Sequence, residues 1–323
     1  MRAVARIVAV ALCALFQQPV VTEYPLPRSG AFPHDPAVAN DGTVWFTDQH
    51  NSFIGRLDPQ TGRVVDYPTP TRNAGPHGIV VAPDGVVWFT ENAKGKIGRL
   101  DPATGSIREY MLPAAARDPH TPLILDGKIW FTAQGANLYG WLDSASGETR
   151  VFPLGIPHAR PYGLVAGPDR SIWIALFGTN RIGRIKPADG SLHLFALPAQ
   201  DARPRRLIVD GGSIVWFTDY ERGALGRLDP ASGDVQEFPS PGGPNSAPYG
   251  IALGTDGRVW YDESSTGQMI AFDPVSHRMS VTTIPTPGAI VRNISVDSTR
   301  GRVWLALSGT SRLGNIQLLE FAP

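Results

Sequence analysis

The chain has 323 residues, and its 29 basic and 29 acidic side chains give a formal net charge of zero. Nucleic acids and anionic membrane surfaces favour partners with a clear positive excess, so this balance argues against both. The hydrophobic content of 42% and the length are those of a globular protein with a sizeable core.

The first residues have the pattern of a targeting signal. Two arginines precede an apolar stretch from Ile7 to Phe16, which is too short to span a membrane and is typical of a secretory signal peptide. We therefore expect a signal peptide over residues 1–19 and a soluble protein exported to the periplasm or the medium, with no membrane span. The single cysteine, Cys13, falls in this segment, and the bulky Leu12 before it argues against a lipoprotein anchor.

A repeat of 42 to 44 residues runs through the rest of the chain. Its clearest marker is a tryptophan that follows a β-branched residue, at Trp45, Trp88, Trp130, Trp173, Trp216, Trp260 and Trp304. A period in this range, with four short strands per unit, is the signature of a β-propeller blade. We predict an all-β fold, a seven-bladed β-propeller of four-stranded antiparallel blades, as a single domain over residues 20–323.

The second repeat shows the expected order of strands. They are predicted at 78–82, 86–90, 95–100 and 107–112. The last two are joined by Asp101–Gly105, in which Asp bonds its own backbone, Pro presets φ and Gly accepts a positive φ, so the segment makes a hairpin turn. Each repeat is thus one meander of four strands.

The two ends of the chain are expected to meet in the last blade. The seventh repeat stops without its final hairpin, while the segment VTEYPL near the N-terminus resembles the fourth strands of other repeats. We predict that Val21–Leu26 supplies the outer strand of the last blade. This closure covers strand edges that would otherwise invite aggregation.

One polar position is expected to form a ring around the axis. The first strand of each blade lines the channel, so the residue at its start recurs around the channel mouth. The ring consists of His34, His77, His120, Tyr162, Arg205, Tyr249 and Arg292. All seven side chains can bond a ligand, and we expect a small molecule to bind there. A repeat protein can also keep such a ring as the lining of a water-filled channel.

A second ring is expected where the second strand of each blade ends. It reads Asp48, Glu91, Ala133, Leu176, Asp219, Glu263 and Leu307. Because the first two strands are antiparallel neighbours, we expect each histidine of the first ring to face the acidic residue of its own blade. The repeated tryptophans are expected in the core between blades. The remaining histidines are expected at the surface: His50, His158, His193 and His277.

The repeated pattern P-H/Y-G-I, GPDG, WFTE, KIGRLDP and EYPLP is similar to that of the streptogramin B (virginiamycin B) lyase family, from about Thr22 to Gly314. The resemblance implies a seven-bladed propeller. It also implies a carbon–oxygen lyase that opens a cyclic depsipeptide antibiotic at its ester by β-elimination, with Mg²⁺ in a shallow site at the channel mouth.

The resemblance also implies roles for particular residues. Gly75–Ile79 matches the element that carries a substrate-contacting histidine, which is His77 here. The segment DPHT matches the catalytic element, with Asp118 as metal ligand and His120 as base, and Gln134 takes the place of a second glutamate ligand. Here the matched pair lies in the second and third repeats, whereas the family carries it in its last blades. Substrate binding is assigned to the other members of the first ring: His34, Tyr162, Arg205, Tyr249 and Arg292.

Two alternatives remain open. A metal-dependent lactonase would activate water with a ring of carboxylate ligands at the channel mouth: Asp48, Glu91, Asp219 and Glu263. A non-catalytic exported propeller would instead bind an anionic or carbohydrate ligand through Arg205, Arg292 and the tyrosines of the ring. In each case we expect a monomer with a small-molecule ligand.

Overall fold

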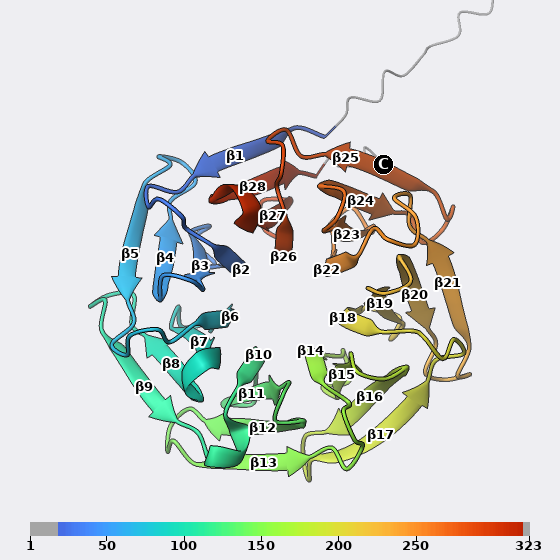
Figure 1. Ribbon diagram of the computed structural model, residues 1–323, viewed down its shortest axis with the longest axis horizontal. Helices are drawn as coiled ribbons and strands as arrows, with labels where there is room; N and C mark the ends of the chain where they lie inside the picture. The colour runs from blue at the N-terminus through green and yellow to red at the C-terminus, as the bar shows by residue number, and fades with distance from the viewer. Residues whose placement is uncertain (1–18, 319–323) are drawn as a thin grey trace, which may run out of the picture.

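Seven four-stranded antiparallel sheets stand around a central axis in the computed structural model, which describes residues 19–318 (Figure 1). Within each sheet the first strand lies nearest the axis and the fourth lies at the rim. The predicted seven-bladed propeller is confirmed. The predicted signal peptide, apart from residue 19, lies outside the described residues.

The strands follow the repeats one by one. Blade 1 holds β2 (Pro33–Val38), β3 (Val44–Asp48), β4 (Phe53–Leu57) and β5 (Val64–Pro68); blade 2 holds β6 (Pro76–Val81), β7 (Val87–Glu91), β8 (Lys96–Leu100) and β9 (Ile107–Met111); blade 3 holds β10 (Pro119–Leu125), β11 (Lys128–Ala133), β12 (Leu138–Asp143) and β13 (Thr149–Pro153); blade 4 holds β14 (Pro161–Ala166), β15 (Ile172–Leu176), β16 (Arg181–Lys186) and β17 (Ser191–Ala196). Blade 5 holds β18 (Pro204–Val209), β19 (Val215–Asp219), β20 (Ala224–Leu228) and β21 (Val235–Pro239); blade 6 holds β22 (Pro248–Leu253), β23 (Val259–Glu263), β24 (Gln268–Phe272) and β25 (Met279–Thr283); blade 7 holds β26 (Val291–Asp297), β27 (Arg302–Leu307), β28 (Arg312–Gln317) and β1 (Val21–Pro25).

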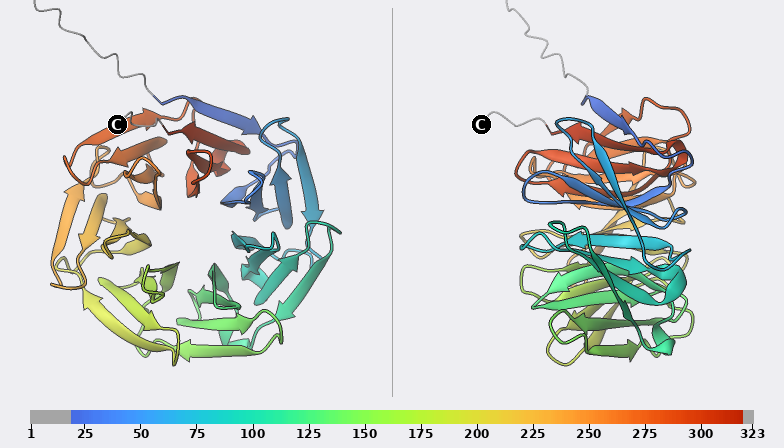
Figure 2. Two further views of the ribbon diagram at one scale, coloured as in Figure 1. Left: turned by 180° about the vertical axis from the view of Figure 1, so that it is seen from behind. Right: turned by 90° about the vertical axis from the view of Figure 1, so that its left-hand side faces the viewer.

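The last blade is closed by the N-terminal strand, as predicted. Strand β1 pairs antiparallel with β28, from Val21 opposite Ile316 to Pro25 opposite Arg312. The carboxylate of Glu23 on β1 also accepts a hydrogen bond from the backbone N–H of Thr286, which follows the outer strand of blade 6. Figure 2 shows this N-terminal strand completing the rim of the ring, seen from behind and edge-on.

The repeated tryptophans lie between blades, which confirms their predicted place in the core. All seven are at most 3% exposed. Trp45 of blade 1, for example, shares a buried cluster with Val87, Phe89 and Leu100 of blade 2. Burying an aromatic side chain of this size against the next blade contributes about 2–3 kcal/mol of hydrophobic stabilisation. The repeat therefore carries its own contact with the neighbouring blade.

A β-bulge interrupts the first strand of every blade. In blade 1, Pro33 lies opposite Asp48 and Pro36 lies opposite Phe46, so three steps along β2 match two steps along β3. The same shift occurs between the first two strands of the other six blades. A bulge places two successive residues opposite one partner and re-aims their side chains. The ring residue and the residue after it both lie within this bulge.

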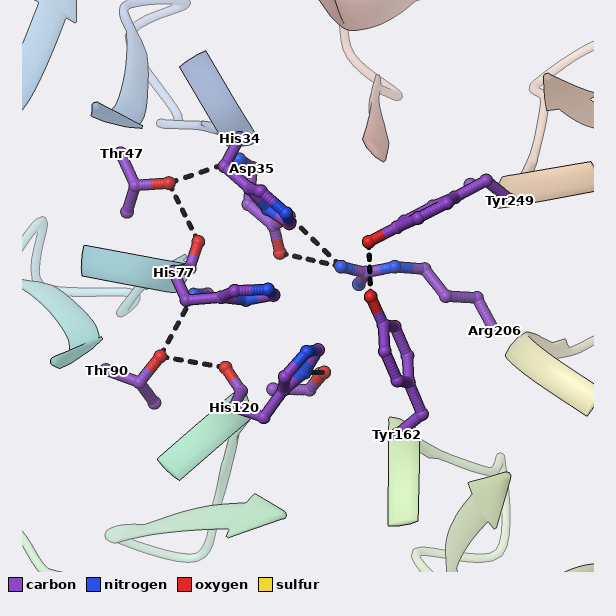
Figure 3. A network of polar contacts seen from close by, with 12 residues as sticks. His34, Asp35, Thr47, His77, Thr90, His120, Tyr162, Arg206 and Tyr249 are labelled. Atoms are coloured by element: carbon purple, nitrogen blue, oxygen red, sulfur yellow. Dashed lines mark hydrogen bonds and ion pairs between the residues drawn. The ribbon is translucent and has the colours of Figure 1, made fainter. Parts of the chain in front are cut away.

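A threonine hydroxyl connects each bulge to the next blade in four of the seven blades. Thr90 accepts a hydrogen bond from the N–H of Gly78 at 2.9 Å and donates one to the carbonyl of His120 at 2.8 Å. Thr47 makes the same two bonds, to Asp35 at 3.1 Å and to His77 at 2.7 Å (Figure 3). The equivalent threonines of blades 3 and 5 are Thr132 and Thr218.

Helical structure in the described residues is limited to three short 3₁₀ turns. They are η1 (Asn92–Lys94), η2 (Ala114–Ala116) and η3 (Ser308–Thr310). Between residues 19 and 318, then, no helix has the length and apolar character needed to cross a bilayer.

We expect Thr90→Val to lower the free energy of unfolding by about 2–4 kcal/mol, because the isosteric side chain leaves the buried N–H of Gly78 and the carbonyl of His120 without partners. Urea unfolding of the two proteins measures the difference. Thr90→Ser keeps the hydroxyl and should cost less than Thr90→Val. Equal losses for the two variants would contradict the assignment of this stabilisation to the hydroxyl group.

Candidate functional site

A polar pocket of about 370 Å³ lies at the centre of the ring, where the first strands begin. All nine residues predicted as site residues line it: His34, His77, His120, Tyr162, Arg205, Tyr249, Arg292, Asp118 and Gln134. The structure therefore brings together side chains that are up to 258 positions apart in the sequence, from His34 to Arg292. Their individual roles stay predictions.

Three imidazole rings form a continuous series along one side of the pocket. The ring centroids of His34 and His77 lie 3.8 Å apart, those of His77 and His120 lie 3.7 Å apart, and Tyr162 follows His120 at 4.1 Å. Figure 3 shows the three imidazoles projecting from adjacent blades toward the axis. The hydrogen bonds of Thr47 and Thr90 to the carbonyl groups of His77 and His120 set the distance between the strands that carry these rings.

All three imidazoles are held in their neutral form at pH 7. Burial lowers the pKa of His34, although the hydrogen bond and the charge of Asp35 act in the opposite direction. The pKa values of His77 and His120 lie well below the usual value of histidine, first because of burial and then because of neighbouring histidines and of Arg206 and Arg205. A neutral imidazole can accept a proton, which is the form that a general base needs.

His34 differs from the other two histidines because a carboxylate holds it. Its Nδ1 lies 2.8 Å from Oδ1 of Asp35, the next residue in the bulge. Asp35 in turn accepts hydrogen bonds from Arg206 of blade 5 at 3.0 and 3.1 Å, so the pair meets across the axis (Figure 3). Burial alone would raise the pKa of Asp35, but Arg206 and His34 outweigh it and keep the pKa below its usual value.

The group His34, Asp35 and His77 also has the ligand types of a metal site, with ligand atoms within 4.8 Å of one another. Because Arg206 already neutralises the carboxylate of Asp35, we interpret the group as a hydrogen-bonded network. Neither Asp35 nor Arg206 was predicted as a site residue. The sequence held only a weak indication of their role: each directly follows a residue of the first ring in the chain.

The opposite side of the pocket is aromatic and cationic. The hydroxyl groups of Tyr162 and Tyr249 are hydrogen-bonded to each other, and Arg205 donates a hydrogen bond to the hydroxyl of Tyr162 at 3.1 Å. Burial and the neighbouring Tyr249 raise the pKa of Tyr162, so its hydroxyl stays protonated at neutral pH. Arg292 of blade 7 completes this side.

Asp118 and Gln134 offer the oxygen ligands that Mg²⁺ prefers, and both line the pocket. The carboxylate of Asp118 accepts hydrogen bonds from the backbone N–H groups of Gly135 and Ala136, one on each oxygen. A second lone pair on each oxygen is left for an ion. The two side chains therefore fit Mg²⁺, with one negative charge from Asp118 and a neutral amide oxygen from Gln134. Oxygen atoms of water or of a bound ligand would have to fill the remaining coordination positions.

The expectation that each histidine faces the acidic residue of its blade is wrong. The acidic position pairs with the proline before the histidine, as in Pro33 with Asp48 and Pro76 with Glu91, because of the bulge. The four carboxylates of the lactonase hypothesis (Asp48, Glu91, Asp219 and Glu263) are at most 1% exposed, and among the described residues none of them lines the central pocket.

Three of these four carboxylates hold the loop that leads into their own blade. Asp48 accepts a hydrogen bond from the N–H of Phe32, Asp219 from that of Arg203, and Glu263 from that of Gly242. Glu91 is the exception: both of its carboxylate oxygens are buried without a hydrogen-bond partner within the described structure. Asp48, Asp219 and Glu263 thus fix the loops around the pocket and do not line it.

Several lining residues were not predicted. The loops after the second strands contribute Gln49 and Asn92, and blade 4 contributes Arg160 and Phe177. His50 is exposed, as predicted, but it also lines the pocket, and its ring stacks on Phe32 with centroids 3.9 Å apart. Their position after W-F-T or before the first strand is the signal that would have found them.

Comparison with known proteins identifies the family. The model of the virginiamycin B lyase family matches residues 7–146 and 122–320. The chain belongs to this family. No curated protein sequence matches it.

Three solved structures illustrate the likeness. Selenomethionine-substituted virginiamycin B lyase from Staphylococcus aureus is 27% identical, with 94% of this chain and 100% of that chain covered and a TM-score of 0.86. A streptogramin B lyase is 28% identical, with 94% and 98% covered and the same TM-score of 0.86. A catalytically inactive histidine-to-alanine variant of the Staphylococcus aureus enzyme with quinupristin is 26% identical, with 94% and 100% covered and a TM-score of 0.86.

We expect Glu91→Gln to remove a pH dependence from the stability of the protein. Burial and the nearby Glu109 raise the pKa of Glu91 to about 8, against 4.5 for an ordinary glutamate. As pH rises above 4.5 the unfolded state loses this proton first, so the stability of the parent falls up to about pH 8. The total loss is on the order of 2–4 kcal/mol.

Urea unfolding at pH 5 and pH 8 tests this: Glu91→Gln should match the parent at pH 5 and exceed its stability at pH 8. Glu263→Gln is the matched control, because the carboxylate of Glu263 accepts hydrogen bonds from Ser240, Gly242 and Thr266. That variant should be less stable than the parent at both pH values. A Glu91→Gln profile parallel to that of the parent would contradict the prediction.

Proposed function

We propose that the protein is a carbon–oxygen lyase that opens a cyclic depsipeptide of the streptogramin B type, or a related lactone, by β-elimination. Membership of the virginiamycin B lyase family supports the reaction class. The observation that carries the proposal is the set of buried, neutral imidazoles on the wall of the central pocket. A proton next to a carbonyl is weakly acidic, so its removal needs such a base held in place.

In the proposed step, the base takes the proton from the carbon beside the carbonyl. The electron pair of that C–H bond forms a C=C bond, the C–O bond on the next carbon breaks, and the carboxylate of the ester leaves with the electron pair. The proton stays on the imidazole until it is released to water. The product therefore contains the same atoms as the substrate, whereas hydrolysis would add the atoms of one water molecule.

We assign the base to His120, the residue that the resemblance implies. Its Nδ1 lies 3.1 Å from the hydroxyl of Thr121, and its imidazole packs between His77 and Tyr162. His77 and Tyr162 would contact the substrate on either side. His34 is a second candidate base, favoured by one specific observation: it alone of the three histidines is held by a carboxylate, that of Asp35.

Mg²⁺ belongs to the same proposal. Asp118 and Gln134 would hold it, and when bound it supplies a Lewis acid that polarises a carbonyl group. Because Asp118 is the single charged ligand, we expect weak binding that depends on the presence of substrate. Export after cleavage of residues 1–19 is also proposed, and the mass of the mature protein recovered from the periplasm or the medium measures it.

We expect purified protein to convert a type B streptogramin into a linear product of unchanged mass, as read by mass spectrometry with added Mg²⁺ and with a chelator. A product heavier by one water would instead support the lactonase. That rival is weakened because none of its four carboxylates lines the pocket, and three of them (Asp48, Asp219 and Glu263) are hydrogen-bonded to the loops that lead into their blades. An unaltered substrate under both conditions would contradict the lyase.

His120→Gln should reduce turnover about 10²–10⁴-fold, because the amide cannot accept the proton, while similar volume keeps the melting temperature close to that of the parent. His34→Gln is the matched comparison at the other end of the imidazole series. If His34→Gln loses turnover and His120→Gln keeps it, the base is His34 and the assignment to His120 is wrong.

A further inference from the structure

Three arginines line the pocket and none of them forms a salt bridge within residues 19–318; two of them, Arg205 and Arg292, are half-buried, whereas Arg160 is exposed. Arg205 lies on β18 of blade 5 and Arg292 on β26 of blade 7. Within residues 19–318, neither forms a salt bridge, and the Nε atom of each is buried without a hydrogen-bond acceptor. Both side chains are half-buried, and a cation that is partly removed from water without a counter-charge favours an anionic ligand.

Aromatic rings hold Arg205 in one orientation. The central carbon of its guanidinium lies 4.0 Å from the ring centroid of Tyr249, 4.2 Å from that of Tyr220 and 4.7 Å from that of Tyr162. These contacts cover the faces of a planar group whose N–H donors point outward in its plane. Beyond the hydrogen bond that it donates to the hydroxyl of Tyr162, a guanidinium fixed in this way has N–H donors left for a carboxylate.

The side chains that line the pocket carry a net positive charge. Arg160, Arg205 and Arg292 are cationic, and Asp118 is the single acidic lining residue of the described chain. The neighbouring Arg206 is already paired with Asp35. A concave site with one sign of excess charge concentrates ligands of the opposite sign.

The rest of the lining is rich in hydrogen-bonding side chains. Gln49, Asn92 and Gln134 contribute three carboxamides from blades 1 to 3. Carboxamides both donate and accept hydrogen bonds, which suits a ligand that carries several hydroxyl groups. A polar pocket of this kind would leave a purely apolar ligand with many unpaired groups around it.

We propose that Arg205 and Arg292 form a carboxylate subsite, and that the pocket binds a hydroxylated organic carboxylate of the sugar-acid class. The carboxylate lies between the two guanidinium groups and the hydroxyl groups face the carboxamides. This binding is independent of turnover. Resting on the proposed function, one consequence follows: a substrate whose carboxylate adjoins the carbon that loses the proton would be activated by the two arginines, which neutralise the developing charge.

Calorimetric titration of the mature chain with galacturonate, galactose and inorganic phosphate tests the subsite. Galacturonate and galactose differ by one carboxylate, so galacturonate should bind about ten- to hundredfold more tightly than galactose. Equal affinity for the two sugars would overturn the proposal. Tighter binding of phosphate than of galacturonate would overturn the assignment to a carboxylate and identify a phosphate site.

Variants of the two arginines connect the selectivity to the subsite. Arg292→Met and Arg205→Lys should each weaken galacturonate about tenfold or more and leave galactose unchanged, because one removes a charge and the other removes the fork. Arg63→Met is the control, since it removes the same charge from an exposed turn at the rim. Far-ultraviolet circular dichroism and thermal unfolding verify that each variant is folded.

The two proposals fail separately. Retained selectivity for galacturonate together with no turnover of a streptogramin would contradict the lyase and leave the subsite standing. Turnover of a streptogramin with unchanged galacturonate binding in Arg292→Met would contradict the subsite and leave the lyase standing.

Discussion

The hydroxyl of the threonine in W-F-T is the contact on which the geometry of the pocket depends. In blades 1, 2, 3 and 5 it accepts the N–H of the second bulge residue of its own blade and donates to the carbonyl of the ring residue of the next blade. One atom thus holds the bulge open and sets the spacing between neighbouring first strands. The ring centroids of His34, His77 and His120 lie 3.7 to 3.8 Å apart, with the rings tilted by 44°, because consecutive blades share this connection.

Burial and charge then divide the pocket into two sides with different chemistry. On blades 1 to 3, desolvation lowers the pKa values of the imidazoles, so this side carries no positive charge at neutral pH. On blades 4 to 7, the tyrosines and Arg205 and Arg292 form a cationic side that can receive an anion. The ion pair of Asp35 and Arg206 links the two sides and removes one positive charge from the centre. This division agrees with the proposed base and the proposed anion subsite, because an elimination that forms or adjoins a carboxylate needs both a proton acceptor and a counter-charge.

The fold could be predicted from the sequence because each repeat carries its own turns, its tryptophan and its strand pattern. Most of the pocket followed from the same period, since equivalent positions of successive blades meet at the axis. The error concerned the acids: alternation along an ideal antiparallel pair would place Asp48 against His34, but the bulge inserts one residue and moves the pairing to Pro33. The pair of Asp35 and Arg206 was missed because it joins positions 171 residues apart that no shared motif connects.

The repetition of the bulge also explains how a site can lie on different blades of one fold. All seven first strands have the same register shift, so each ring residue is delivered to the axis by the same local geometry. A histidine and an acid placed on any two adjacent blades would therefore meet in equivalent positions. What differs from blade to blade is the surroundings: His120 and Asp118 of this chain face Arg205 and Arg292 across the pocket. The repeat therefore decides the position of the proposed base, while the side chains of the opposite blades decide the charge that a ligand would meet.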